Sequence, residues 1–179
     1  MMAGWKKQAV RAGAVVAGAV LVLSGQTASA SAAQATIGPY RFVNQSSGKC
    51  LEVADWRTDD GAPIRQWDCT GGANQKWRLV SPTEYATGSW ALVNVNSGKC
   101  VVGSGDGSLA SGTELRQVTC TGWQTWIVSN YPNPEDATIR TGDLALEIGG
   151  FSGAQGAPAQ VWWWNGGANQ RWWMQPTTG

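Results

Sequence analysis

The sequence predicts an all-β domain that closes into a barrel with pseudo-threefold symmetry, and three observations support that prediction. A Gln-x-Trp triplet occurs at 75–77, 124–126 and 170–172, so that its tryptophans lie 49 and 46 residues apart. Short apolar or alternating runs stand between turn residues, which is typical of strands joined by tight turns. Beyond residue 30, no segment keeps a 3.6-residue apolar period, which disfavours amphipathic helices.

The first 30 residues have the pattern of a signal peptide. Three basic residues precede an apolar stretch at 12–23, and small residues at 27–33 suit a signal peptidase. We expect cleavage after Ala30 or within three residues of it, a short linker over 31–36, and a secreted, extracellular protein. An uncleaved membrane anchor is the alternative, but 12 apolar residues are few for a bilayer span.

The rest of the chain is expected to form a single domain over 37–176, made of three copies of one unit. Copy one covers roughly 37–81, copy two 85–129 and copy three 131–175. Repeats of this length are typical of architectures in which no single copy can bury its own apolar face. We expect about four short strands in each copy. Twelve antiparallel strands in three groups favour closure, because a closed barrel has no exposed edge.

Within each copy the motifs follow one order. A first strand, at 40–43 in copy one and 91–95 in copy two, ends at a turn rich in Asn, Ser and Gly. Ser-Gly-Lys-Cys-Leu-Glu-Val follows in copy one, and shorter versions of it follow in the other two copies. A Gly-Gly-Ala-Asn-Gln segment then leads into the Gln-x-Trp triplet in copies one and three.

Charge and length exclude several classes of protein. Without the predicted signal peptide, 10 Lys and Arg stand against 12 Asp and Glu, a net charge of −2. Charges of both signs are interspersed and form no basic block, which disfavours nucleic acid and anionic membranes as partners. About 149 residues remain, which suits one domain. We expect a monomer that needs no cofactor.

The four cysteines follow the repeats. Cys50 and Cys69 are 19 residues apart in copy one, and Cys100 and Cys120 are 20 apart in copy two. Four cysteines allow three pairings. Repeat symmetry selects Cys50–Cys69 and Cys100–Cys120, and export makes disulfides the expected state. A zinc site is the rival interpretation, but the chain has no His and no Cys-x-x-Cys.

The tryptophans of the three triplets are predicted to be core residues rather than ligand platforms. Each copy needs one large apolar anchor, and a buried tryptophan removes roughly 150–250 Å² from water. Trp77, Trp126 and Trp172 supply that anchor three times. Copy three lacks a cysteine pair and has Ala145 and Trp164 at the matching positions, so we expect an aromatic side chain to fill that place.

A second group of residues has the pattern of a binding surface. Residues i, i+2 and i+4 of a strand share one face. This rule groups Arg65, Trp67 and Cys69 in copy one, and Gln160, Trp162 and Trp164 in copy three. Trp56 and Phe151 fall at equivalent offsets, in the loop after the Glu-bearing strand. An indole offers a flat apolar surface to a sugar ring, while carboxylates and amides bind its hydroxyls.

These motifs together resemble the ricin-type β-trefoil lectins, which include the trefoil carbohydrate-binding modules of many bacterial glycan-degrading enzymes. The resemblance covers nearly all of the chain beyond the signal peptide, and it implies a β-trefoil fold. It also implies a pocket built from an acidic residue two positions after the first cysteine, an amide and an aromatic residue before the second cysteine, and Asn-Gln from the last motif.

The resemblance assigns these pocket positions to residues of each copy. In copy one they are Glu52, Arg65, Trp67, Asn74 and Gln75. In copy three they are Glu147, Gln160, Trp162, Asn169 and Gln170. In copy two they are Val102, Arg116, Val118, Trp123 and Gln124, so the carboxylate, the aromatic and the asparagine are lost together. This joint loss indicates a functional unit, and we expect working pockets in copies one and three.

The chain departs from the family pattern at two kinds of position. Glu52 and Glu147 stand where the family usually has Asp. The extra methylene moves the carboxylate about 1.5 Å deeper, which would change the preferred sugar or abolish binding of galactose-like ligands. Arg65 replaces an amide, which removes an acceptor and adds a charge; Asp55 and Asp68 lie near enough in sequence to pair with it.

No catalytic arrangement is expected. The absence of His excludes Ser-His-Asp and Cys-His groups, and paired cysteines leave no thiol nucleophile. Glu52 and Glu147 belong to different copies, whereas glycoside hydrolysis needs two carboxylates across one bond. Asp59-Asp60-Gly61 lacks the spaced ligands of a calcium loop and indicates an ordinary turn, so we expect no metal.

The sequence therefore predicts a secreted, non-enzymatic lectin module that binds sugar units of a plant or microbial polysaccharide or glycan. The alternative is a trefoil that binds or inhibits another protein and has degenerate sugar pockets. A small glycosidase is a third hypothesis, which release of sugar from a polymer would reveal.

Overall fold

The computed structural model of the chain divides into two units, Met1–Ser31 and Ala32–Gly179. It describes Met1 and residues 34–81, 88–105, 109–121, 124–129 and 135–178, and the fold below is that of the second unit. Apart from Met1, the predicted signal peptide lies outside the described residues. No helix in the described part of the chain has the length and apolarity to cross a membrane.

Twelve strands are found in the described residues, four in each copy, as the sequence predicts. Copy one has β1 (Thr36–Asn44), β2 (Cys50–Val53), β3 (Ile64–Trp67) and β4 (Trp77–Val80). Copy two has β5 (Ser89–Asn94), β6 (Cys100–Gly103), β7 (Leu115–Val118) and β8 (Trp126–Ser129). Copy three has β9 (Thr138–Thr141), β10 (Leu144–Ile148), β11 (Ala159–Trp163) and β12 (Trp172–Pro176). Short 3-10 turns, η1 (Ala54–Trp56), η2 (Ala73–Gln75), η3 (Gly149–Phe151) and η4 (Ala168–Gln170), occur in copies one and three.

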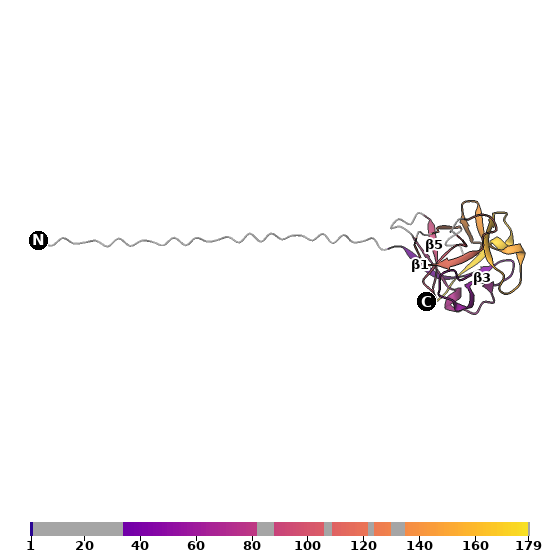
Figure 1. Ribbon diagram of the computed structural model, residues 1–179, viewed down its shortest axis with the longest axis horizontal. Helices are drawn as coiled ribbons and strands as arrows, with labels where there is room; N and C mark the ends of the chain where they lie inside the picture. The colour runs from indigo at the N-terminus through magenta and orange to yellow at the C-terminus, as the bar shows by residue number, and fades with distance from the viewer. Residues whose placement is uncertain (2–33, 82–87, 106–108, 122–123, 130–134, 179) are drawn as a thin grey trace. The chain divides into compact units, whose positions relative to one another are not determined.

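Six strands close a barrel; two of them, β1 and β5, are labelled in Figure 1. β1 pairs with β4, β4 with β5, β5 with β8 and β8 with β9, always antiparallel. β12 pairs with β1, and a bridge between Ala137 and Trp172 joins β12 to the residue before β9. The ring is thereby complete, which removes the exposed edges that an open sheet would present.

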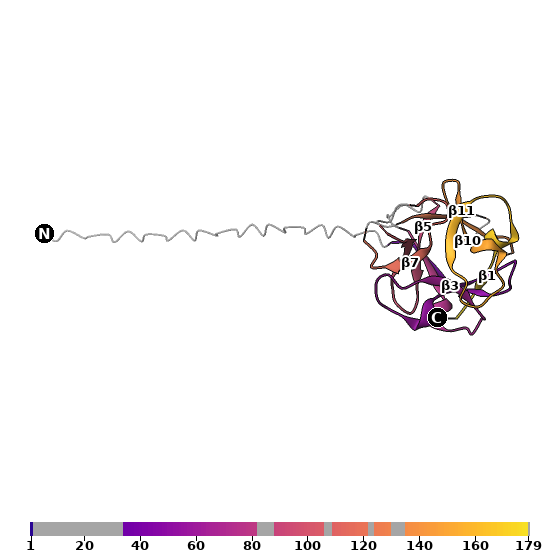
Figure 2. The ribbon, with the colours of Figure 1, turned by 45° about the vertical axis from the view of Figure 1, so that its right-hand side comes forward.

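The other six strands form three hairpins, β2–β3, β6–β7 and β10–β11. Figure 2 shows β10 and β11 side by side. Three isolated bridges join the hairpins to one another. They pair Pro63 with Arg116, Arg65 with Pro158, and Glu114 with Gln160. Each hairpin is therefore supported by the other two copies. Backbone hydrogen bonds join β3 to residues 156–157 of copy three and β11 to residues 112–113 of copy two.

The tryptophans of the three triplets are in the core. Trp77, Trp126 and Trp172 are all fully buried. Their indole nitrogens donate to the backbone carbonyls of Leu51 (3.0 Å), Val101 (3.4 Å) and Leu146 (3.2 Å). Each ring thus fills the centre of its copy without leaving its polar N–H unpaired, which a buried indole requires. The prediction of a symmetric core ring is confirmed.

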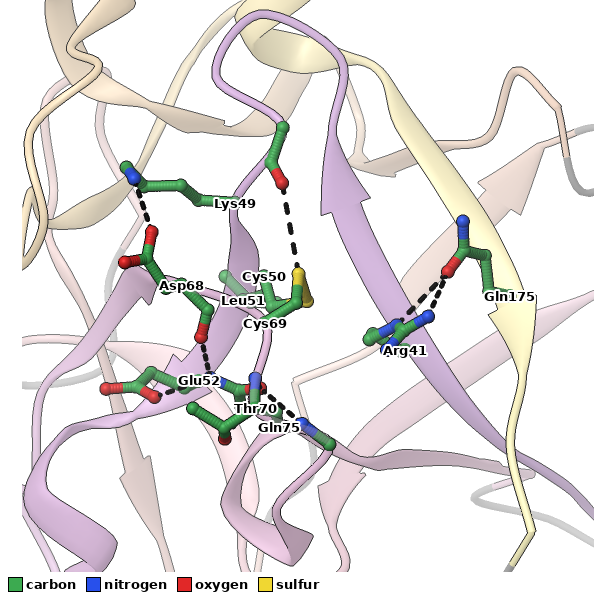
Figure 3. The surroundings of a disulfide bond; sticks show 12 residues. Arg41, Lys49, Cys50, Leu51, Glu52, Asp68, Cys69, Thr70, Gln75 and Gln175 are labelled. Carbon is green, nitrogen blue, oxygen red and sulfur yellow. Dashed lines mark hydrogen bonds and ion pairs between the residues drawn. A yellow bond between two sulfur atoms is a disulfide. The ribbon is translucent and has the colours of Figure 1, made fainter.

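Two disulfides fasten the hairpins of copies one and two. Cys50 is bonded to Cys69 and Cys100 to Cys120, with 5.1 Å between the Cα atoms in each pair. The predicted pairing is confirmed, and none of the four cysteines is free. Figure 3 shows the first disulfide between β2 and the segment after β3, close to Glu52 and Gln75.

Copy three uses packing where the other copies use a disulfide. Ala145 is fully buried at the position of the first cysteine. Trp164 stands at the position of the second, half-buried, with the guanidinium of Arg140 stacked 5.2 Å from the centroid of its ring. The aromatic residue and the cation above it thus occupy the predicted place.

Trp172 and Trp173 allow a matched test of the core. They are adjacent on β12, but Trp172 is fully buried while Trp173 is 40% exposed. We expect Trp172→Ala to lower the free energy of unfolding by about 3–5 kcal/mol, because it leaves a cavity at the centre of the copy. Trp173→Ala is expected to cost less than about 1 kcal/mol. Urea unfolding measures both, and equal losses would contradict the assignment of a core ring.

Candidate functional site

Two hollows lie at corresponding places in copies one and three, and equivalent residues differ in number by 95. Hollow one has a volume of about 190 Å³ and is lined by Glu52, Asp55, Trp56, Arg65, Trp67, Thr70 and Asn74. Hollow three has a volume of about 300 Å³ and is lined by Glu147, Gly150, Phe151, Gln160, Trp162, Asn165 and Asn169. The structure therefore brings together four of the five residues predicted in each copy.

A buried carboxylate forms the base of hollow one. Glu52, on β2, is only 3% exposed. One of its oxygens, Oε2, accepts from Nδ2 of Asn74 (3.2 Å) and from Nε2 of Gln75 (3.0 Å), and the other, Oε1, accepts from Nε of Arg65 (3.0 Å). These donors replace the water that the carboxylate loses on burial.

Glu147 has the same role in hollow three. It is also 3% exposed. Its Oε2 accepts from Asn169 (3.1 Å) and Gln170 (2.8 Å), and its Oε1 accepts from Nε2 of Gln160 (2.9 Å). A carboxylate offers about four acceptor positions, so three protein donors leave room for one more. That position is available to a donor from a ligand.

Gln75 and Gln170 lie behind the carboxylates rather than in the hollows. Both are fully buried. Besides its bond to Glu52, Gln75 donates to the carbonyl of Asp68 (2.8 Å) and accepts from the backbone N–H of Thr70 (2.8 Å); Figure 3 shows these contacts. Gln170 repeats the arrangement in copy three. The expectation that these glutamines contact a sugar is therefore corrected: they orient the carboxylate that does face the hollow.

Asn74 and Asn169 combine a fixed donor with a free acceptor. Besides its bond to the Glu carboxylate, each Nδ2 donates to a backbone carbonyl, that of Val53 (3.1 Å) or Ile148 (3.0 Å). Two acceptors around each nitrogen define which way the amide points. The Oδ1 atoms are buried and have no hydrogen-bond partner. An unpaired buried acceptor costs about 1–3 kcal/mol, so each of these asparagines, which line the hollows, carries an acceptor whose hydrogen bond is not made within the protein.

An aromatic side chain lies at the rim of each hollow, and its residue has a backbone conformation that bulky residues rarely adopt. Trp56 and Phe151 are each 55% exposed, and both have positive φ angles, +56° and +55°. The left-handed region costs roughly 1–2 kcal/mol for a residue with a Cβ, and such strain is found at binding sites. The sequence shows that these residues are equivalent, but it gives no signal of this conformation.

Copies one and three differ in how the indole of Trp67 or Trp162 is covered. The guanidinium carbon of Arg65 lies 4.4 Å from the centroid of the Trp67 ring, and Nη2 of Arg65 bonds to Asp55 (2.8 Å). In copy three the equivalent indole, Trp162, is 41% exposed. Asp55 as the partner of Arg65 fits the sequence prediction. Asp68 instead bonds to Lys49 (2.6 Å).

Copy two keeps the scaffold without the site. Val102 and Arg116 are paired across β6 and β7 at the places of Glu52 and Arg65. Gln124 has no carboxylate to hold, and its Nε2 donates to the hydroxyl of Thr141 (3.2 Å). Val118 ends β7 where the other copies carry an indole, while Trp123 lies outside the described residues.

The resolved shifts in carboxyl pKa lie outside both hollows, in the loop between η1 and β3. Hydrogen bonding by Arg57 lowers the pKa of Asp59, and hydrogen bonding by Lys99 lowers the pKa of Asp60. Asp60 also accepts from the backbone N–H of Thr119 (2.8 Å). The Asp60 contacts join copy one to copy two, while Arg57 and Asp59 pair within the same loop of copy one, so these charges belong to the scaffold. Their stabilising effect is present at neutral pH and is lost as the pH falls through the lowered pKa values.

Four residues of the two linings were not predicted: Asp55 and Thr70 in copy one, and Gly150 and Asn165 in copy three were missed as site residues. The constant offset of 95 residues between the copies could have identified them as equivalent pairs. Each hollow is lined by aromatic side chains, a held carboxylate and an asparagine with an unpaired oxygen, a set of groups suited to a small polyhydroxyl compound. No group of three or more potential metal-binding side chains occurs among the described residues.

Two family profiles match the chain, each over half of its length. The profile of the ricin-type beta-trefoil lectin domain-like family matches residues 27–118. The profile of the ricin-type beta-trefoil lectin domain matches residues 88–179. Together they span the three copies and confirm the β-trefoil fold that the sequence resemblance implies.

Solved structures of similar fold include designed and natural proteins. A designed threefold-symmetric protein, ThreeFoil, has a TM-score of 0.71 and 30% identity, with 79% of this chain and 100% of that chain covered. The exo-beta-1,3-galactanase 1,3Gal43A from Clostridium thermocellum has a TM-score of 0.70 and 32% identity over 78% of this chain and 30% of that chain. The Macrolepiota procera ricin B-like lectin, in complex with lactose, has a TM-score of 0.64 and 22% identity, with 80% and 96% covered.

A curated relative matches over a short stretch. Serine protease 1 from Rarobacter faecitabidus is 47% identical over 36 residues, which are 20% of this chain and 7% of the protease. The match therefore covers a small part of the relative, and it gives no evidence of protease activity in this chain.

Gly167 tests how tightly the wall of hollow three is built. Its backbone angles, φ −62° and ψ 150°, suit any residue, but a Cβ would lie 2.6 Å from Oδ1 of Asn169 and 2.9 Å from Cζ of Phe151. We expect Gly167→Ala to lower the free energy of unfolding by about 1–3 kcal/mol through this clash. A Cβ at Gly153 would have no neighbour within 4 Å, so Gly153→Ala should be neutral. Thermal unfolding of both variants checks the geometry, and a neutral Gly167→Ala would contradict it.

Proposed function

This chain belongs to the family of ricin-type β-trefoil lectin domains, and we propose that it is a non-catalytic module that binds sugar units of an oligosaccharide or polysaccharide in hollows one and three. Carbohydrate is its proposed partner, in line with the family and with a lectin of the same fold that is in complex with lactose. A plant or microbial polysaccharide is the ligand class that we favour.

The observation that carries the proposal is the combination of groups in hollow three. Trp162 offers an exposed ring on which the C–H face of a sugar can stack. Glu147 keeps one acceptor position free, and Oδ1 of Asn169 is buried without a partner. The residues that carry these two acceptors line a hollow of about 300 Å³, at the lower end of the range for ligand sites. One sugar ring with two hydroxyl donors would satisfy both.

Hollow one repeats the frame around Glu52 and Asn74, and so supports a second site. Two weak sites on one rigid domain would bind a polymer more tightly than either alone, since the second contact forms within the same complex. Single shallow pockets of this type bind with dissociation constants of about micromolar to millimolar. We therefore propose a polymeric ligand with repeated sugar units.

Chemistry at the hollows argues for binding without catalysis. Hydrolysis of a glycosidic bond needs two carboxyl groups about 5–10 Å apart, on either side of the bond. Glu147 is the one carboxylate among the lining residues of hollow three. In hollow one, Glu52 and Asp55 are both bonded to the same guanidinium, that of Arg65, so they lie on one side of the hollow rather than on either side of a bound glycosidic bond.

We also propose that the protein is exported. The N-terminal pattern of basic, apolar and small residues supports a signal peptide. Two disulfides are consistent with an oxidising compartment. Detection of the protein in culture medium with a processed N-terminus would test this part of the proposal.

Trp162 and Trp163 provide the test of sugar binding. They are adjacent on β11 and both exposed, 41% and 58%, but only Trp162 lines hollow three. Binding is measured by pull-down on insoluble xylan, cellulose, β-1,3-galactan and chitin, and by calorimetry with lactose, cellobiose and xylotriose. We expect Trp162→Ala to weaken binding at least tenfold, because the stacking surface is lost, while Trp163→Ala leaves it unchanged.

Two outcomes would contradict the proposed function. One is a chain that binds none of these carbohydrates, which would favour the protein-binding alternative. The other is a carbohydrate that binds equally well to wild type, to Trp162→Ala and to the double variant Trp67→Ala/Trp162→Ala. Release of soluble sugar from any of the polymers would overturn the non-catalytic assignment.

A further inference from the structure

We propose that Arg65 is an internal occupant of hollow one, so that the two hollows are unequal and a neutral sugar binds in hollow one only when this guanidinium moves away. The inference rests on the proposed function, because it concerns which hollow binds sugar. It makes hollow three the primary site and hollow one a second, weaker site whose affinity Arg65 determines.

Arg65 contacts the same groups that a sugar would use. Its guanidinium carbon lies 4.4 Å from the centroid of Trp67, on the ring face. Its Nε donates to Oε1 of Glu52 (3.0 Å), the oxygen that is not already held by Asn74 and Gln75. A sugar stacked on this indole and bonded to this carboxylate would have to displace both contacts.

The charged contacts of Arg65 differ in strength. Glu52 is buried, with 4% of its side chain exposed, and Arg65 itself is mostly covered, at 18%. Removing the guanidinium would leave a buried carboxylate with one fewer charged donor, which is unfavourable. Asp55 is 70% exposed, so its bond to Nη2 of Arg65 is weakened by solvent. The contact with Glu52 is therefore the main one that holds Arg65 in the hollow, and Asp55 supports it.

Hollow three lacks counterparts of both Arg65 and Asp55. Gly150 stands at the place of Asp55, and Gln160 at the place of Arg65. Gln160 donates one hydrogen bond to Glu147 (2.9 Å), and among the described residues no cation is stacked on Trp162. The hollow is correspondingly larger, about 300 Å³ against about 190 Å³. Asp55 and Gly150 have closely similar left-handed backbone angles, so at this position the two hollows differ by the side chain.

Acidic sugars are an unfavourable alternative ligand for hollow one. Nη2 of Arg65 could in principle attract a sugar carboxylate, but Glu52 and Asp55 already surround the guanidinium with two negative charges. A third carboxylate would be repelled by both. The observations therefore favour occlusion of a neutral-sugar pocket over a pocket for anions.

Arg65→Gln tests the inference because it gives hollow one the chemistry of hollow three. Binding is measured by calorimetry on the full chain in a Trp162→Ala background, which isolates hollow one. The neutral probes are lactose, cellobiose and xylotriose, and galacturonic acid is the acidic probe. We expect Arg65→Gln, alone or with Asp55→Gly, to tighten binding of a neutral probe at least tenfold. In the chain without the Trp162→Ala change, it should raise the stoichiometry from one site to two.

Arg116→Gln is the matched control. Arg116 has the equivalent position on β7 of copy two, where its cross-strand neighbour is Val102 and its ion pair is with Glu114 (3.2 Å). Neither hollow is lined by Arg116, so its replacement should leave sugar binding unchanged. Thermal unfolding of all variants shows whether they fold.

Each result separates the two proposals. If folded Arg65→Gln gains no affinity for any neutral probe, Arg65 is not an occupant and this inference is wrong, whatever happens at hollow three. The inference would also be overturned if galacturonic acid bound to the Trp162→Ala chain more tightly than the neutral probes and if Arg65→Gln abolished that binding. If the Trp162→Ala change does not weaken the binding seen with the wild-type chain, the proposed function is contradicted. A gain of affinity in Arg65→Gln would still support the role of Arg65.

Discussion

The structure depends on one short segment in each copy, the Gln-x-Trp triplet, which anchors the core in all three copies and also holds a buried carboxylate in copies one and three. In copy one, Gln75 donates to Glu52, and two residues later Trp77 donates from its buried indole to the carbonyl of Leu51. Leu51 directly precedes Glu52 on β2. The Gln-x-Trp triplet therefore holds two neighbouring residues of β2: the backbone of Leu51 and the side chain of Glu52. Copy three repeats these contacts through Gln170, Trp172 and Leu146, so the shape of each hollow is tied to the packing of its copy.

Copy two separates the two roles of the triplet. Trp126 is fully buried and still bonds to Val101, at 3.4 Å, so the core role survives. Val102 stands where a carboxylate would lie, and Gln124 turns to Thr141. Since the barrel closes through copy two all the same, the carboxylate is not needed for the fold. Glu52 and Glu147 are buried charges that the scaffold can omit, and their presence in two copies is best explained by a ligand.

The sequence predicted the repeats, the strands, the tryptophan core and the cysteine pairs, because each rests on periodicity or symmetry. The resemblance to the lectin family predicted which residues gather in each copy, and alternation along a strand put the aromatic residue and its neighbour two positions earlier on one face. Alternation does not say how far a side chain reaches. Gln75 was expected at the sugar but is buried behind Glu52, and Arg65 covers the ring of Trp67. Trp56 and Phe151 have a left-handed backbone, and their rings lie against Gly72 and Gly167, which are distant in sequence; no local pattern in the sequence records either feature.

The central claim is that sugar contacts an exposed indole beside a held carboxylate and never the indoles of the core ring. Two-dimensional NMR of the indole N–H groups tests it most directly, during titration with the oligosaccharide that binds best. The account predicts that the signal of Trp162 shifts in a saturable way, while those of Trp77, Trp126 and Trp172, all fully buried, stay in place. Binding that leaves the Trp162 signal unmoved, or that shifts the core signals instead, would contradict it.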